Sequence, residues 1–285
     1  MRGLWIIVSG LALSVTAAFA GSTVTVKGSD TMVILGQRWA EMYMDTHPGA
    51  VVQVTGGGSG TGIAALINGA ADVAQSSRIM SDREKAEIMT HRGAAAVGVP
   101  VAMDGVAVYV HKDNPVARLT FAQVRRIYLG DITNWKEVGG PDAAIAVYSR
   151  ENNSGTYTFF KDRVLKNEDF TPECQMLAGT ATVVHVISRE PYAIGYGGVG
   201  YSHGVKAVAI AVAADSTYYE PTHDNVTAMK YPLSRYLYWY TVGDPKGAVK
   251  DLVAWVLSPA GQKVVADVGY YPLPQEGGAA RKGEP

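Results

Sequence analysis

Residues 149–156 read SRENNSGT and lie between an apolar run at 143–148, typical of a strand, and a helix-periodic apolar run at 157–165. A helix that begins at such a turn presents unpaired N–H groups and a partial positive charge, which suit a bound oxyanion. Arg150 adds a planar set of donors that can bind two oxygens of one anion. The stretch therefore predicts an anion-binding turn where a strand passes into a helix.

Two further turns of the same kind precede it in the chain. Residues 27–31 read KGSDT after one β-branched run, and residues 55–62 read TGGGSGTG after another. Glycine lets the backbone approach a ligand closely, and Ser and Thr hydroxyls donate hydrogen bonds without adding charge. One such turn is usually only a helix cap. Three in one chain, one of them with an arginine, favour an anion site.

Strand and helix patterns alternate along the chain with short turns between them, which predicts an α/β architecture with mostly parallel sheets. Two long β-rich runs, at residues 94–110 and 235–241, are expected to cross between two lobes joined by a hinge. Lobe 1 is predicted to comprise residues 21–104 and 236–285, and lobe 2 residues 105–235. Further predicted elements are a helix capped by Ser81 and Glu84, a helix at 120–129, strands at 182–188 and 205–212, and a helical stretch at 246–268.

The N-terminus has the pattern of a cleavable signal peptide over residues 1–20. Arg2 precedes an apolar run at 4–18 that is too short for a transmembrane helix, and the Ala-Phe-Ala sequence ending at Ala20 matches an A-x-A cleavage site. We therefore expect an exported, periplasmic protein without stable membrane insertion, whose mature chain starts near Gly21.

Composition excludes several classes of function. The formal net charge of −1 gives no reason to expect binding to nucleic acid or to an acidic membrane surface. Cys174 is the only cysteine, so an intramolecular disulfide is impossible. The six histidines are scattered without an i, i+4 pair, which argues against a zinc site. The GYGGVG sequence at residues 195–200 is followed by a strand pattern, whereas a dinucleotide site needs a helix there. We expect neither a metal nor a cofactor.

Four motifs, in order along the chain, resemble those of the periplasmic phosphate-binding subunit of high-affinity phosphate ABC transporters. They are GSDT at residues 28–31, GGGSGTG at 56–62, DVAQSSR at 72–78 and SRENNSGT at 149–156, and YPLSR at 231–235 resembles the family too. The resemblance covers nearly the whole mature chain. It implies the type II periplasmic binding protein fold, in which two lobes, each a mostly parallel sheet flanked by helices, are joined by two crossover strands and close on a dehydrated phosphate. It also implies a monomer that delivers inorganic phosphate to permease subunits in the inner membrane.

The resemblance implies phosphate ligands in three of the motifs, namely Ser29, Asp30, Thr31, Ser59, Arg150, Ser154, Gly155 and Thr156. Ser77 and Arg78, in the motif at 72–78, are further candidates for the phosphate site. Members of the family often carry an aspartate in the motif at 72–78 that accepts the proton of phosphate, and Ser77 stands at that position here. Asp30 is the best remaining acceptor, although it could instead be a helix N-cap. Arg78 is either a second cation on the anion or a surface salt-bridge partner. Asp104, expected on the first crossover strand, could orient an arginine.

Three other functions remain open from the sequence. A binding protein for another oxyanion, such as sulfate, molybdate or arsenate, would share these turns. A phosphate sensor or scavenger without a permease would share them as well. A phosphatase could use Ser154 or Ser59 as nucleophile, but neither serine has an obvious adjacent base or metal set, and Thr61 breaks a G-x-S-x-G pattern around Ser59. We therefore expect no catalytic residue.

Overall fold

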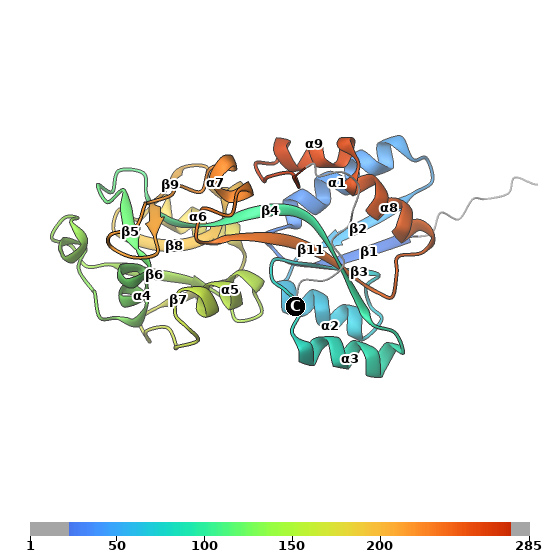
Figure 1. The fold of residues 1–285 in the computed structure, drawn as a ribbon, viewed down its shortest axis with the longest axis horizontal. Coiled ribbons are helices and arrows are strands. Elements are labelled where there is room, and N and C mark those ends of the chain that lie inside the picture. Colours follow the sequence, from blue (N-terminus) through green and yellow to red (C-terminus); the bar gives the residue numbers. More distant parts are fainter. Residues whose placement is uncertain (1–22, 275–285) are drawn as a thin grey trace, which may run out of the picture.

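The computed structural model describes residues 23–274, which form two α/β lobes connected by two long strands (Figure 1). Lobe 1 contains a parallel sheet in the order β2-β1-β3, with helices on both faces. Its N-terminal elements are β1 (Thr23–Gly28), α1 (Val33–Thr46), β2 (Val51–Thr55), α2 (Ser59–Ile67), β3 (Val73–Ser76) and α3 (Asp82–Arg92). Two C-terminal helices, α8 (Gly247–Leu257) and α9 (Pro259–Asp267), complete it.

Lobe 2 is built around the parallel neighbours β8-β6-β7, with a separate parallel pair of β5 and β10. Its elements are β5 (Arg118–Thr120), α4 (Phe121–Leu129), the 3-10 turn η1 (Trp135–Val138), β6 (Ala146–Arg150), α5 (Gly155–Arg163), β7 (Gln175–Leu177), α6 (Thr180–Ile187), β8 (Ala193–Gly198), the 3-10 turn η2 (Val199–Tyr201), β9 (Val205–Ala207), β10 (Ala209–Ala211) and α7 (His223–Thr227). This confirms the predicted α/β class with mostly parallel strands.

Two antiparallel strands, β4 (Ala96–His111) and β11 (Ser234–Val242), carry the chain between the lobes. The first half of β4 pairs with β11, whereas its second half pairs with β8 and β9 of lobe 2. Strand β11 lies between β3 and β4, so one continuous sheet runs in the order β2-β1-β3-β11-β4-β8-β6-β7. The two predicted crossover strands are therefore confirmed, and they form a paired ribbon.

Each lobe has its own apolar core. In lobe 1 the indole rings of Trp39 and Trp239 meet edge to face at 5.4 Å, which ties α1 to the strand β11. In lobe 2 the rings of Phe160 and Tyr196 stack at 3.8 Å, which ties α5 to β8. Aromatic packing of this kind contributes beyond its buried area. It holds α5 in a fixed place relative to the sheet.

The predicted strand at 182–188 is wrong, because this segment forms helix α6. Its valines are β-branched, which favoured a strand by local preference. However, Val183 and Ile187 are four residues apart and both fully buried, so they pack one helical face against β8. Tertiary burial has therefore overridden the local preference.

Other predictions concern element boundaries. The run at 205–212 forms two short strands, β9 and β10, that pair with different partners. The stretch at 246–268 is two helices, because α8 ends at Leu257 and Pro259 begins α9 as its first residue. The capping box of Ser81 and Glu84 is confirmed at the start of α3. GYGGVG lies mostly in the buried strand β8 and leads into the 3-10 turn η2, so no dinucleotide-binding helix follows it.

The predicted signal peptide, its cleavage near Ala20 and residues 275–285 lie outside the described residues. Within residues 23–274, no helix combines the length and the apolar character needed to cross a membrane.

Candidate functional site

The three predicted turns meet in one place, at the carboxyl ends of strands of the continuous sheet. Ser29 follows β1, Ser59 begins α2 after β2, and Ser77 follows β3, all in lobe 1. Arg150 ends β6 and Gly155 begins α5, both in lobe 2. Open α/β sheets bind ligands at this edge, where strand ends and helix N-termini converge.

Hydroxyl groups from both lobes form the centre of the site. The Oγ1 atoms of Thr31 and Thr156 share a hydrogen bond of 2.8 Å between the lobes. Within lobe 1, the Ser77 N–H donates to Ser59 Oγ at 3.1 Å, and the two serine hydroxyls lie 3.4 Å apart. All four residues are at most 1% exposed. The structure thus joins Thr31, Ser59, Ser77 and Thr156 in one buried group, which we call the hydroxyl cluster.

Ser154 and Gly155 shape the lobe 2 side of this cluster. The Ser154 hydroxyl caps α5 by accepting from the N–H groups of Thr156 and Tyr157. A side chain on Gly155 would place its Cβ 2.4 Å from Ser59 Oγ, so only glycine lets the helix start approach the serines of lobe 1. Both residues therefore bring the N-terminus of α5 to the cluster.

Arg150 is the cation next to the hydroxyl cluster. Its Nη2 atom donates to Asp30 Oδ2 at 2.9 Å and its Nη1 atom donates to Thr180 Oγ1 at 2.6 Å, whereas the buried Nε atom has no partner among the described residues. Its side chain is 1% exposed. Burial lowers the pKa of Arg150, and the charge of Asp30 only partly offsets this effect. A guanidinium this buried favours a second anionic partner, because one carboxylate leaves part of its donors unused.

Asp30 joins the two lobes through that ion pair. Its Oδ1 atom accepts from the Gly57 N–H at 2.7 Å, so the carboxylate connects two of the predicted turns as well. The alternative role as a helix N-cap is wrong, because α1 has Met32 at its N-cap and no side-chain cap bond. Each carboxylate oxygen accepts one N–H from these partners, and an ionised carboxylate has further acceptor capacity on both.

The glycine turn at 56–60 contacts the arginine turn directly. The Gly60 N–H donates to the Asn153 carbonyl at 2.9 Å, and the Asn153 Nδ2 donates to the Gly57 carbonyl at 3.1 Å. Gly58 has a φ of +89°, and a Cβ there would lie 2.6 Å from the Asn153 carbonyl oxygen. The two lobes are therefore in close contact across the site, as expected for a closed conformation.

The structure does not bring Arg78 into the hydroxyl cluster. Its two terminal nitrogens donate to the two carboxylate oxygens of Glu84, at 2.8 and 2.6 Å, at the start of α3. Burial disfavours the charge on Glu84, but hydrogen bonds from Arg78 and Ser81 outweigh it and lower the pKa of the carboxyl.

Ser29 is buried at the end of β1, where its backbone N–H donates to the Gln75 carbonyl at 2.8 Å.

Arg235 ends the YPLSR motif and lies at the site, although it was not among the predicted ligands. Its Nη2 atom donates to Thr156 Oγ1 at 3.0 Å and its Nη1 atom to the Ser77 carbonyl at 2.9 Å. The Asp104 carboxylate holds it, which confirms the expectation that Asp104 orients an arginine. The available signal was indirect: both residues stand on the two predicted crossover strands, and a paired ribbon would place them opposite one another.

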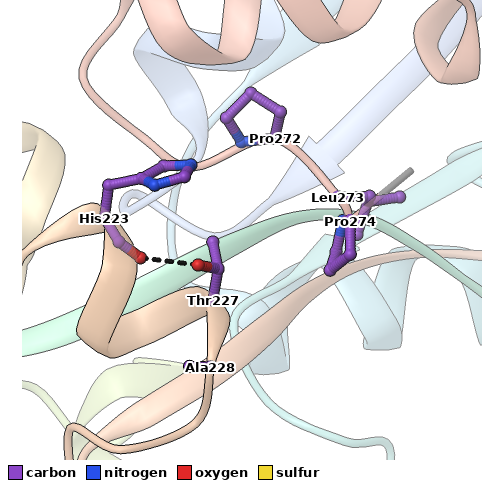
Figure 2. A pocket seen from close by; sticks show the side chains of 6 residues that line it. All are labelled: His223, Thr227, Ala228, Pro272, Leu273 and Pro274. Atoms are coloured by element: carbon purple, nitrogen blue, oxygen red, sulfur yellow. Dashed lines mark hydrogen bonds between the residues drawn. The ribbon is translucent and has the colours of Figure 1, made fainter. Parts of the chain in front are cut away.

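A surface hollow lies away from the hydroxyl cluster. About 440 Å³ in volume, it lies between α7 and the C-terminal segment, and Figure 2 shows its six lining residues. It shares no residue with the hydroxyl cluster. Within residues 23–274, no group of three or more His, Cys, Asp or Glu side chains could hold a metal ion.

Comparison with known proteins places these features in a family context. A family model described as a PBP superfamily domain matches residues 14–260. The chain is 36% identical over 264 residues to the phosphate-binding protein PstS of Pseudomonas aeruginosa. The aligned region covers 87% of this chain and 82% of that protein. It is 31% identical over 255 residues to PstS of Bacillus subtilis, with 89% and 82% covered.

A solved structure agrees with these relatives. The chain superposes with a TM-score of 0.80 on a phosphate ABC transporter substrate-binding protein from Clostridium perfringens, which was crystallised with bound phosphate. The two are 30% identical, and the match covers 89% of this chain and 100% of the other.

The Arg78–Glu84 pair should stabilise the fold rather than the site. Because the folded-state pKa of Glu84 lies below its ordinary value of 4.5, its contribution is fully present above that value and is lost as pH falls through the folded pKa. We expect Arg78→Met to lower the free energy of unfolding by about 1–3 kcal/mol near neutral pH and by much less at about pH 3. Urea unfolding at both pH values measures this.

Arg83→Met is the matched control, because the Arg83–Glu87 pair on the same helix is exposed. Its effect on the free energy of unfolding should be close to zero at either pH, because an exposed ion pair contributes little. An Arg78→Met effect that is the same in acid and at neutral pH would contradict the assignment to Glu84 ionisation.

Proposed function

The chain belongs to the PstS-type phosphate-binding proteins of the PBP superfamily, and from this premise we propose that it captures inorganic phosphate between its two lobes and delivers it to the membrane permease of an ABC importer. Protein working in this way would act in the periplasm as a monomer, after removal of residues 1–20. No covalent chemistry is required of it. Binding and closure of the lobes suffice, because an anion that contacts both lobes stabilises the closed state over the open one.

The observation that carries the proposal is the buried hydroxyl cluster with Arg150 beside it. Neutral O–H and N–H groups can surround an anion and donate hydrogen bonds to its oxygens without adding charge to the site. Donors come from both lobes, since Ser59 and Thr31 belong to lobe 1 and Thr156 to lobe 2. The N-terminus of α5 adds its partial positive charge, although Ser154 already accepts from the N–H groups of Thr156 and Tyr157. These groups match the oxygens of a tetrahedral oxyanion.

The phosphatase alternative has little support in the contacts of its two candidate nucleophiles. The Ser154 hydroxyl is occupied as the cap of α5, and the Ser59 hydroxyl interacts with Ser77. Within residues 23–274 no histidine or carboxylate bonds to either hydroxyl, so a general base that could activate them is not in place. We therefore propose a binding protein and not an enzyme.

Selectivity for phosphate over sulfate requires an acceptor, because phosphate at neutral pH carries a proton and sulfate does not. Ser77 stands where a carboxylate was expected from the family. Asp30 is the carboxylate next to Arg150, and its acceptor capacity is only partly filled by Gly57 and Arg150. We propose that Asp30 accepts the phosphate proton, in addition to orienting Arg150.

Phosphate should raise the thermal stability of the mature protein. At a hundredfold excess over the dissociation constant, binding adds about 2.7 kcal/mol to the free energy of unfolding. For a chain of this size that corresponds to a rise in Tm of roughly 5–10 °C. Differential scanning fluorimetry on protein stripped of phosphate by unfolding and refolding measures it. No shift at millimolar phosphate, in protein shown to be folded, would refute phosphate binding.

Arg150→Lys should weaken phosphate binding, whereas Arg78→Lys should not. A lysine ammonium cannot reproduce the planar donor set that reaches Asp30 and Thr180 at once. We expect a loss of about 2–4 kcal/mol for Arg150→Lys, measured by titration calorimetry. Arg78 is a half-buried arginine outside the cluster, so Arg78→Lys should bind within about twofold of wild type. Equal losses of phosphate affinity in the two variants would show that Arg150 does not contribute to the phosphate site more than Arg78 does.

Asp30→Asn should reduce the preference for phosphate over sulfate. The amide adds donors and removes the charge, so sulfate meets less repulsion and phosphate loses its acceptor. We expect the ratio of the two affinities to fall by about tenfold, which corresponds to about 1.4 kcal/mol. Competition of both anions against radiolabelled phosphate gives the ratio.

Asp72→Asn controls for the loss of a carboxylate that bonds a backbone N–H, because Asp72 accepts from Thr25 at the edge of lobe 1. Its ratio should equal that of wild type. If Asp30→Asn lowers both affinities and leaves their ratio unchanged, Asp30 only positions Arg150.

A further inference from the structure

Arg235 is buried at the point where the chain crosses between the lobes. It stands on β11 directly opposite Asp104 on β4. Its Nε and Nη2 atoms donate to Asp104 Oδ2 at 2.9 and 2.7 Å, and the two side chains are 4% and 0% exposed. The Asp104 Oδ1 atom also accepts from the Val199 N–H at 2.9 Å. The carboxylate therefore fixes the position of the guanidinium from inside the hinge.

The remaining contacts of this guanidinium reach both lobes. Nη1 donates to the carbonyl of Ser77 in lobe 1, and Nη2 donates to Oγ1 of Thr156 in lobe 2. The ring of Phe159 lies 5.2 Å from its central carbon. Arg235 is thus directed at two residues of the hydroxyl cluster, although neither contact is a charge pair.

The direction of the hydrogen bond to Thr156 follows from chemistry alone. An arginine has only donors, so Thr156 Oγ1 must accept from Nη2. The single hydroxyl proton of Thr156 then points to another acceptor. In the closed structure this is Thr31 Oγ1 at 2.8 Å or Ser77 Oγ at 3.5 Å, and an anion between the lobes would be a stronger one.

We propose that Arg235 is a positioning residue that makes Thr156 a hydrogen-bond donor to the bound anion, with Asp104 holding it in place. The inference rests on the proposed function, because it assigns a role within the phosphate site. A hydroxyl that already accepts from a cation is polarised and donates more strongly. Arg235 therefore strengthens anion binding through Thr156, without itself contacting the anion.

A double-mutant cycle between Arg235 and Thr156 tests this, with phosphate affinity measured by titration calorimetry. Arg235→Lys keeps the charge but cannot reach Asp104, Ser77 and Thr156 together. Arg235→Lys and Thr156→Val should each weaken binding about tenfold. In the Thr156→Val background, Arg235→Lys should change affinity by less than about twofold, because the hydroxyl through which it acts is gone. In the Thr156→Ser background, which retains the hydroxyl, the loss of about tenfold should return.

A purely structural arginine, or one that contacts the anion directly, would give losses that add in the Thr156→Val background, and that result overturns the proposal. Unchanged affinity in Arg235→Lys overturns it too. If Arg235→Lys does not fold, the neutral pair Asp104→Asn with Arg235→Gln replaces it in the same cycle, with the same expected non-additivity. Arg125→Lys, which changes an arginine paired with Glu168 in lobe 2, is the control and should bind as wild type.

The wild-type titration separates this inference from the function on which it rests. Wild-type protein that does not bind phosphate would refute the proposed function, and the role of Arg235 with it. Wild-type protein that binds phosphate while the cycle is additive would refute only the role of Arg235.

Discussion

The buried ion pair of Asp104 and Arg235 is the interaction on which the arrangement of the lobes depends. Each residue sits on one of the two strands that belong to both lobes, and strand pairing places them opposite one another. Such a pair adds little net stability compared with apolar residues of the same size, because both charges must leave water. Removing one partner, however, costs about 3–5 kcal/mol, since the other charge is then buried alone. The pair therefore specifies how the crossover strands meet more than it stabilises them.

The second ion pair of the site, Asp30 with Arg150, is of a different kind because its partners come from different lobes. Any separation of the lobes pulls these two charges apart, whereas Asp104 and Arg235 can stay together on their paired strands. Between the two pairs lie the four hydroxyl groups, which carry no charge. The Asp30–Arg150 pair therefore forms only when the lobes close, whereas the Asp104–Arg235 pair can persist when they open.

Features that depend on local sequence could be predicted. The turns at 28–31, 56–62 and 149–156 are recognisable because glycine allows close approach of the backbone and a helix N-terminus favours an anion. The capping box at Ser81 is equally local. Helix α6 was missed because its valines are chosen for burial against β8, which no window of neighbouring residues reveals.

The partner of each charged side chain could not be read from the chain. Arg78 and Arg150 both follow strands that end at the site, but Arg78 meets Glu84 in its own lobe and Arg150 meets Asp30 across the cleft. Arg235 ends the YPLSR motif, which contains no glycine turn before a helix, so its local sequence did not assign it to the anion site. Its role depends on the register between β4 and β11, which is set by pairing over many residues and by the irregularity between Leu237 and Tyr238.

The position of β11 has a consequence for how the molecule acquires its structure. This strand comes late in the sequence but lies inside the sheet, between β3 and β4. Lobe 2 is formed from an uninterrupted length of chain and can complete its strand pairing without β11. The sheet of lobe 1 must wait for residues 234–242, which join segments about 130 or more positions earlier in the sequence. Contacts over such separations form slowly, because the loop they close is long. During folding, β3 and β4 therefore remain for a time without hydrogen-bond partners on the edges that β11 later occupies. Unpaired strand edges of this kind promote aggregation.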